Sequence, residues 1–256
     1  MSSNKIEIDT KTGEPQETDC ARETGGALVI GLTGGIGTGK STAAKYLLDA
    51  ELPAGFGAGG LTSAVTAPAL VHVDADAISR QLTVKEPEVT NPVLEELRDA
   101  FEGADIHVLR EDGSLDRAAM ASLVFADPEK KKLLEDILFR HIIQEIHRQI
   151  DEAGKAGRPV LLDVPLLFES GLDSLCDYVI ALSVDEDVRI GRVVARDGCS
   201  EEDVRARIRN QMSDEERRTR ADFVVENSGS REELFRQLDE VLAEIGASTA
   251  GKGKTQ

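Results

Sequence analysis

The sequence predicts an α/β fold in which a five-stranded parallel sheet is flanked by helices. Five short runs are rich in β-branched and other apolar residues, and they lie at 27–33, 69–73, 159–163, 178–184 and 222–226. Such runs are typical of strands that are buried on both faces of a parallel sheet. The segments between them have helical periodicity, as expected of crossover helices. The 256 residues are enough to bury a core without disulfides or metal.

Tails are expected at both ends of this domain. Residues 1–26 lack the apolar stretch of a secretory signal and carry too many acids for a mitochondrial transit peptide, so we expect a disordered tail. Residues 246–256 are small and polar and carry no lipidation signal, which predicts a second, flexible tail. One continuous domain is therefore expected at 27–245.

A glycine-rich motif, GGIGTGKS at 34–41, follows the first strand and opens a helix. It fits the phosphate-binding loop GxxxxGK[ST] in both contexts that the motif requires, whereas the competing interpretation is a simple glycine-rich turn. Glycines let backbone N–H groups converge on phosphate oxygens, where the helix N-terminus adds positive potential. Lys40 is expected to reach the β- and γ-phosphates and Ser41 to ligate Mg²⁺. The expected phosphate-binding residues are Gly35, Ile36, Gly37, Thr38, Gly39, Lys40, Ser41 and Thr42.

A long uncharged stretch follows the first helix, at 52–73. It is long enough to span a bilayer, but its glycines, prolines and polar residues make it a poor membrane helix. We therefore expect a Gly- and Ala-rich surface loop at 53–68, running into the second strand, and no association with a membrane.

Two acidic residues, Asp74 and Asp76, stand where the second strand should end. Ligands of open α/β sheets bind beyond the carboxyl ends of the strands, so both belong to the expected site. If the backbone stays extended, side chains at i and i+2 share a face and the two carboxylates converge. One would then accept a proton from a hydroxyl group while the other orients water around Mg²⁺. The competing interpretation is that one of them only caps the helix that follows.

The interval between the second and third strands predicts a helical region at 79–156. Asp127 and Pro128 are typical of a helix start, and apolar residues then recur at helical spacing until Gly154. This pattern predicts an amphipathic helix of roughly seven turns. The core around the sheet is then discontinuous, and its parts are expected at 27–78, 157–186 and 216–245.

Asp163 ends the third strand. A carboxylate at this place is typical of the residue that holds magnesium beside a phosphate-binding loop. The sequence therefore predicts Ser41 and Asp163 as metal ligands, and the competing interpretation treats Asp163 as a turn residue.

Arginines are concentrated at 189–220, which holds nine Arg and seven acids in a chain whose net charge is −18. The spacing of Arg189, Arg192 and Arg196 places them on one helix face, where their charges repel unless an anion lies between them. Phosphate suits the guanidinium group in this role. We therefore expect a helical lid at 187–215 that closes over ATP and excludes water. The alternative is a solvated helix whose arginines pair with nearby acids.

Composition disfavours several classes of function. With 30 Lys and Arg against 48 Asp and Glu, general nucleic-acid binding is not expected. Three widely separated cysteines supply neither a disulfide framework nor a Cys-x-x-Cys zinc site, so the chain is expected in the cytoplasm. The Asn-Lys-x-Asp motif of guanine-binding proteins does not follow the loop. Phosphoryl transfer to a small acceptor is therefore favoured.

Seven segments, in their order and context, resemble those of dephospho-CoA kinases. They read GLTGGIGTGKST at 31–42, VDAD at 73–76, DGSLDR at 112–117, DVPLLFE at 163–169, RVVARD at 192–197, RIRNQ at 207–211 and ADFVVEN at 221–227. The resemblance covers about 27–245 and implies a three-layer fold of the P-loop kinase type. It implies ATP-dependent phosphorylation of the ribose 3′-hydroxyl of dephospho-CoA, the last step of coenzyme A synthesis, with Mg²⁺ as cofactor.

The resemblance also implies roles for individual residues. Asp76 is the expected general base, and Lys40 and Arg196 complete the expected catalytic set. Arg192 and Asn227 join the loop in binding ATP. The expected acceptor-binding residues are Asp74, Pro165, Leu166 and Glu169.

Two departures from the family pattern leave alternatives open. The chain reads Arg140-His141 where the family usually reads His-Pro, and the loop at 53–68 is longer than usual. Another P-loop nucleoside or nucleotide kinase, or a nucleotide-binding regulatory module without transfer activity, would carry the same phosphate-binding loop. Retention of Asp76, Asp163 and the arginine face of the lid favours an active enzyme. We expect it to act on small-molecule substrates and to be a monomer or weak homo-oligomer.

Overall fold

The structure is a computed structural model that describes residues 26–53, 56, 69–84, 91–101, 103 and 107–252. Four of the predicted segments lie largely or partly outside the described residues. These are residues 1–25 of the first tail, nearly all of the loop at 53–68, residues 85–90, 102 and 104–106 of the helical region, and residues 253–256 of the last tail.

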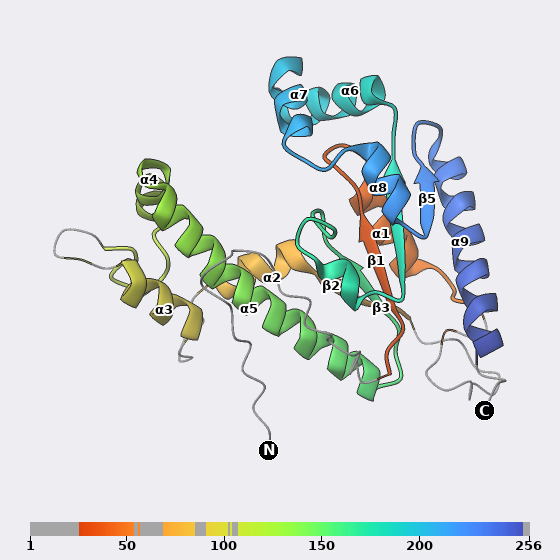
Figure 1. Cartoon of the computed structure of the whole chain (residues 1–256), viewed down its shortest axis with the longest axis horizontal. Helices are drawn as coiled ribbons and strands as arrows, with labels where there is room; N and C mark the ends of the chain where they lie inside the picture. Colours follow the sequence, from red (N-terminus) through yellow and green to blue (C-terminus); the bar gives the residue numbers. More distant parts are fainter. Residues whose placement is uncertain are drawn as a thin grey trace.

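Five parallel strands form one sheet in the middle of the molecule, as predicted (Figure 1). They are β1 (Val29–Thr33), β2 (Val71–Asp74), β3 (Val160–Asp163), β4 (Tyr178–Ser183) and β5 (Phe223–Glu226). Their order across the sheet is β2-β3-β1-β4-β5. Strand β1 therefore lies between β3 and β4, and it is buried along its whole length.

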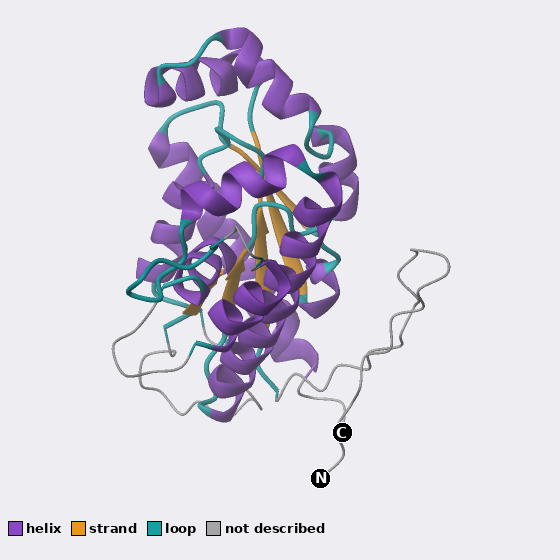
Figure 2. Cartoon of the chain, turned by 90° about the vertical axis from the view of Figure 1, so that its left-hand side faces the viewer, coloured by secondary structure: helices purple, strands orange, loops and turns teal. Residues whose placement is uncertain are grey.

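Helices cover both faces of the sheet, which gives the three layers that the resemblance implies (Figure 2). They are α1 (Lys40–Asp49), α2 (Ala75–Leu82), α3 (Pro92–Phe101), α4 (Arg117–Ala126), α5 (Pro128–Lys155), α6 (Glu186–Asp197), α7 (Glu201–Arg209), α8 (Asp214–Arg220) and α9 (Arg231–Lys252). A short 3₁₀ helix, Leu172–Leu175, precedes β4. None of the helices within the described residues combines the length and the apolar character that crossing a membrane requires.

Alternation along β1 divides the core into two clusters, one on each face of the sheet. Ile30 and Leu32 pack with residues of α1 and α9 in the first cluster. Val29 points the other way and packs with Ile146 and Ile150 of α5 in the second. The central strand is thus held between two apolar layers, and its carboxyl end is fixed in space.

A third apolar cluster lies away from the sheet, within the predicted helical region. It joins α3, α4 and α5 through Leu97, Met120 and Ile137. Helix α5 begins where predicted, because the Asp127 side chain accepts hydrogen bonds from the first backbone N–H groups of the helix. Among the described residues between β2 and β3 there is no further strand of the sheet.

The predicted C-terminal tail is partly wrong, because α9 continues to Lys252. Ile245 is fully buried in the cluster that packs α9 on the sheet, and the Thr249 hydroxyl donates to its carbonyl oxygen. A glycine inside a helix costs only about 1 kcal/mol relative to alanine, so Gly246 does not end a helix that packing supports on its preceding turns.

Arg140 and His141, which depart from the family pattern, connect two helices. Arg140 Nη2 donates to Glu96 Oε1 at 2.8 Å, and His141 Nε2 lies 2.7 Å from Glu96 Oε2. The bond with His141 outweighs the opposing effect of burial, and with the help of Arg140 it lowers the pKa of Glu96 below its ordinary value. These side chains therefore tie α5 to α3.

We expect Glu96→Gln to lower the free energy of unfolding by about 1 kcal/mol at pH 7, because the variant loses two charge-assisted bonds at a half-exposed site. The pKa of Glu96 is lowered in the folded state, so the stabilisation is present above the unfolded value of about 4.3 and is lost as the pH falls through the folded value. Denaturant unfolding between pH 3 and pH 7 measures this difference.

The matched control is Glu135→Gln, which removes an exposed ion pair with Lys131 on α5. It should change the stability by only a few tenths of a kcal/mol. Equal losses in both variants, or a loss in Glu96→Gln that persists at pH 3, would contradict the expectation.

Candidate functional site

The carboxyl ends of three neighbouring strands meet at one edge of the sheet. In the parallel register, Asp163 is the partner of both Leu32 on β1 and Asp74 on β2. The phosphate-binding loop, 34–41, leaves β1 at this same edge and leads into α1. Residues from distant parts of the sequence are thereby brought together.

The phosphate-binding loop folds tightly around its glycines. The Thr38 hydroxyl donates to the Gly35 carbonyl oxygen at 2.9 Å. Gly39 is the N-cap of α1 with φ 88°, a left-handed conformation that favours glycine. A Cβ on Gly39 would also lie 2.3 Å from Asn227 Nδ2, so the loop packs against Asn227 without room for a side chain.

Asn227 is buried against the phosphate-binding loop and supports it. It is 6% exposed, and its Nδ2 donates to the Thr38 carbonyl oxygen at 2.7 Å. Its backbone N–H donates to Ser183 at the end of β4. Its amide nitrogen is used by the loop, and the predicted contact of this side chain with ATP stays a prediction.

Ile36 is also held by protein groups. Its N–H donates to Gln211 Oε1 at 3.0 Å, and its carbonyl oxygen accepts from Arg189 Nε at 2.6 Å. The prediction that the Ile36 amide binds phosphate is thus contradicted by its contacts. No such protein partner is described for the N–H groups of Gly37 and Lys40, so these remain suited to phosphate oxygens.

Lys40 forms an ion pair with Asp163 at the end of β3. The Asp163 side chain is almost fully buried and that of Lys40 is 15% exposed. Ser41 follows on the exposed side of the first turn of α1. The predicted donors of the phosphate site and the predicted metal ligand therefore lie side by side.

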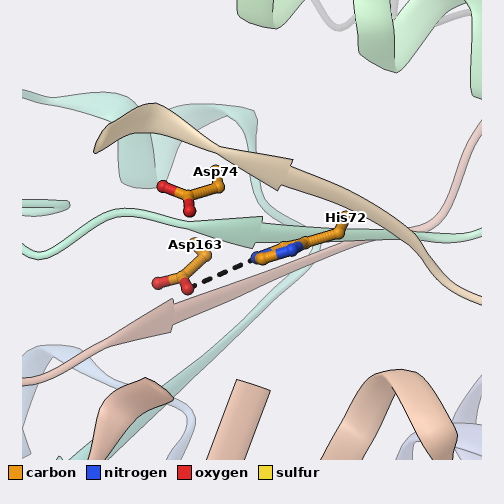
Figure 3. A group of neighbouring side chains, drawn as sticks. All are labelled: His72, Asp74 and Asp163. Atoms are coloured by element: carbon orange, nitrogen blue, oxygen red, sulfur yellow. Dashed lines mark hydrogen bonds and ion pairs between the residues drawn. The ribbon is translucent and has the colours of Figure 1, made fainter. Parts of the chain in front are cut away.

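Asp163 is the centre of a small polar group that also contains His72 and Asp74 (Figure 3). His72 Nε2 lies 3.4 Å from Asp163 Oδ2. Burial by itself would raise the pKa of Asp163, but the interactions with His72 and Lys40 outweigh it and lower that pKa below its ordinary value. The carboxylate is therefore ionised at neutral pH.

The same three side chains form a group that could hold a metal ion. One ligand atom from each of His72, Asp74 and Asp163 lies within 4.8 Å of the others. Two carboxylates suit Mg²⁺, whereas the imidazole nitrogen is a ligand that transition metals prefer. The sequence pointed to Asp163 for this role, and the structure adds two neighbours.

The expected convergence of Asp74 and Asp76 is wrong, because β2 ends at Asp74 and α2 begins at the next residue. The Asp74 side chain accepts a hydrogen bond from the Ala77 N–H at 2.9 Å and caps this helix. Asp76 is exposed on the first turn of α2, and no described residue bonds to its carboxylate. The competing interpretation, in which one of the two acids is a cap, holds for Asp74.

The three arginines of α6 do not share one environment, contrary to the prediction from their spacing. Arg189 is buried against the phosphate-binding loop. Arg192 is half-buried, and its Nη1 is buried without a hydrogen-bond partner among the described residues. Arg196 is exposed and bonds to the neighbouring Asp197. Arg192 and Arg196 are the two lid arginines that were predicted to act on ATP. Of these, Arg192 has a buried guanidinium nitrogen without a described partner, which suits it to bind an anion.

Three of the predicted acceptor-binding residues lie in the segment after β3, and their side chains have different surroundings. The Pro165 carbonyl oxygen accepts from the Thr33 hydroxyl at 3.1 Å, and Leu166 is 45% exposed. Glu169 Oε1 accepts from the Met212 N–H at 3.1 Å and lies 3.7 Å from Arg217 Nη2. Glu169 is therefore already bonded to the segment that joins α7 to α8.

Sequence reasoning missed His72 and Gln211 and misplaced Arg189. His72 looked like an ordinary strand residue, and only its position two residues before Asp74 indicates that both share a face. Gln211 follows the end of α7 and meets Ile36 across 175 positions of the chain. Local sequence carries no signal for such a long-range contact.

Comparisons with known proteins show that the chain is similar to dephospho-CoA kinases over most of its length. A family model described as dephospho-CoA kinase matches residues 28–233. A dephospho-CoA kinase of Corynebacterium efficiens is 42% identical over 219 residues, which cover 85% of this chain and 97% of that protein. One from Corynebacterium diphtheriae is 44% identical over 214 residues, covering 83% and 94%.

Solved structures agree with these sequence relatives. A crystal structure of a Thermus thermophilus protein is 35% identical with a TM-score of 0.63, and the match covers 86% of this chain and 98% of that one. A dephospho-CoA kinase from Campylobacter jejuni is 26% identical with a TM-score of 0.57, again covering 86% and 98%. The described fold is thus shared over nearly the full length of both.

We expect Lys40→Met to bind ATP roughly tenfold to a hundredfold more weakly, because a charged hydrogen bond to phosphate contributes about 1.5–3 kcal/mol. Lys45→Met, on an exposed position of the same helix, is the matched control and should bind ATP as the unmodified protein does. Isothermal titration calorimetry measures both affinities, and equal affinities would remove Lys40 from the phosphate site.

Proposed function

The chain belongs to the dephospho-CoA kinase family, and we propose how its residues carry out that family's activity. The reaction transfers a phosphoryl group from ATP to the ribose 3′-hydroxyl of dephospho-CoA and gives CoA and ADP. The observation that carries the proposal is the meeting of Lys40 and Asp163 beside the phosphate-binding loop. This contact places the cationic side chain of Lys40 and the ionised carboxylate of Asp163 at the carboxyl ends of the strands.

On the donor side, the loop holds the phosphates of ATP. The backbone N–H groups at the start of α1 and the positive end of that helix attract the anion. Lys40 exchanges its ion pair with Asp163 for the β- and γ-phosphates, where its charge offsets the charge that develops during transfer. Ser41 and Thr42, on the first turn, complete the phosphate-binding set with Gly35, Gly37, Thr38 and Gly39.

Mg²⁺ fits the donors at this edge of the sheet. Asp163 supplies a buried, ionised carboxylate, and Asp74 offers a second one nearby. Ser41 and Asp163 would hold the ion, and Asp74 belongs to the same group of side chains as Asp163. When bound, the ion supplies positive charge to the phosphate oxygens.

Asp76 is the general base of the proposed mechanism. Its carboxylate is exposed and bonds to no described residue, so it is free to accept the proton of the 3′-hydroxyl group. Asp74 is the poorer candidate because it caps α2. The oxygen of the deprotonating hydroxyl then attacks the γ-phosphorus in line with the leaving ADP.

The acceptor side is formed by the segment after β3 and by the helical region. Leu166 is an exposed apolar side chain three positions after Asp163, which suits it to contact the acceptor. Pro165 fixes the path of the chain at this point, and Glu169 ties the segment to the end of the lid. We assign the helical region, 79–156, to binding of the acceptor.

The lid, 187–215, contains α6 and α7. Arg192 is poised to bind a phosphate group, since its Nη1 is buried without a described partner. Arg196 must leave Asp197 to reach ATP, so its catalytic role depends on lid closure.

We also infer where and in what form the protein acts. Its substrates are the small molecules ATP and dephospho-CoA, and a net charge of −18 opposes binding to nucleic acid. Few cysteines favour the cytoplasm. We infer a monomer or weak homo-oligomer that works without a membrane.

For the base, we expect Asp76→Asn to lower turnover by about two to four orders of magnitude and to leave ATP affinity within about twofold. Asparagine keeps the size of the side chain but cannot accept the proton. Asp74→Asn is the matched control, because asparagine is also a good helix cap and preserves α2. Coupled ADP-release assays compare the two, and a larger loss in Asp74→Asn would reverse the assignment.

For the acceptor, we expect purified protein with ATP and Mg²⁺ to consume ATP in proportion to added dephospho-CoA and to yield CoA. Adenosine, AMP and shikimate should give at least about a hundredfold lower kcat/KM, because a specific site leaves polar groups unpaired with the wrong acceptor. Chromatographic detection of CoA is the measurement. Preference for a smaller acceptor would refute the acceptor while retaining the kinase, and nucleotide binding without any transfer would refute the enzyme.

A further inference from the structure

The base of the lid packs closely against the phosphate-binding loop, and its hydrogen bonds to the loop backbone centre on Ile36. The Ile36 side chain packs against the small apolar cluster of Ile190, Val193 and Val204, which joins α6 to α7. A residue of the loop therefore belongs to the core of the lid.

Two polar side chains, those of Gln211 and Arg189, bond to the backbone of Ile36. Gln211 Oε1 accepts from the Ile36 N–H at 3.0 Å and from Arg189 Nη2 at 3.2 Å. Arg189 Nε donates to the Ile36 carbonyl oxygen at 2.6 Å. The backbone N–H and the backbone carbonyl oxygen of Ile36 are thus both satisfied by residues at the two ends of the lid.

The contact between Arg189 and the phosphate-binding loop is close and buried. Arg189 is 5% exposed, and a Cβ on Gly35 would lie 1.9 Å from its Nη2. The guanidinium group is also 3.7 Å from Asp214, which offsets part of its charge. A buried peptide group that lost these partners would remain unpaired, so the geometry resists change.

We propose that Arg189 and Gln211 are positioning residues that hold the Ile36 peptide, so that the phosphate-binding loop keeps its shape and Arg192 is carried next to it. Arg192 lies one helical turn beyond Arg189 and has its Nη1 buried without a described partner. The lid then closes around a fixed attachment at its base, and its outer part around Arg196 does the moving.

A preformed loop strengthens nucleotide binding because less ordering is required when the ligand arrives. The inference rests on the proposed function only in that the loop binds nucleotide, and it does not depend on the acceptor. Binding of ADP therefore tests it even if dephospho-CoA is the wrong acceptor.

The test compares Gln211→Met with Gln237→Met. Gln237 is a matched control, because its Oε1 accepts from the Glu226 N–H at 3.0 Å and its Nε2 donates to the Glu226 carbonyl oxygen. Each variant removes a glutamine whose side chain bonds to the backbone of one residue, Ile36 or Glu226, and each side chain is half-buried. Calorimetric titration with ADP and Mg²⁺, together with thermal unfolding, measures affinity and stability.

We expect Gln211→Met to raise the ADP dissociation constant and the KM for ATP about tenfold. The KM for dephospho-CoA should stay within about twofold, as should the ADP affinity of Gln237→Met. Equal ADP affinities in the two folded variants would overturn the proposal, because a merely structural glutamine would lower stability without changing nucleotide binding.

Amide hydrogen exchange in the unmodified protein keeps the proposal testable if Gln211→Met does not fold. The Ile36 N–H should exchange at least about a hundredfold more slowly than an unprotected peptide, both without ADP and with it. The Gly37 N–H should become protected only with ADP. Exchange of Ile36 at the unprotected rate would overturn the proposal.

Discussion

The pairing of β1 with β3 and β4 is the constraint on which the rest of the structure depends. Because all the strands run in parallel, their carboxyl ends fall on one edge, and the register sets Asp163 beside both Leu32 and Asp74. The burial of β1 on both faces fixes the point at which the loop begins. Lys40, in the first turn of α1, then meets Asp163 at this edge, so the donor site depends on the register of the sheet.

Sequence patterns predicted the strands, the loop and the start of α5, because each depends on residues that are close in the chain. Apolar runs mark strands, and Asp127 with Pro128 marks a helix start wherever it occurs. The same reasoning failed at Asp76, since a helix that begins directly after β2 breaks the two-residue alternation. It did not foresee the contacts of Arg189 and Asn227 with the loop, because their partners are more than 150 positions away.

The close approach of neighbouring elements gives the glycines of the loop a second purpose. Phosphate recognition alone explains why the backbone must be accessible. The structure adds that Gly35 leaves room for Arg189 and Gly39 leaves room for Asn227. The loop is thus closely packed against neighbouring protein side chains, and a motif that looks generic is fitted to this particular framework.

Helix α5 is shared by two apolar clusters, which unites parts of the chain that would otherwise look separable. Its 28 residues make a rod about 42 Å long, and in Figure 1 it runs from α4 to the lower end of the sheet. Ile137 lies in the cluster of the helical region and Ile146 in that of the sheet. Unfolding of either cluster would remove the packing contacts of one part of this continuous helix. The two clusters therefore form one cooperative unfolding unit, and damage in the helical region lowers the thermal tolerance of the nucleotide-binding sheet as well.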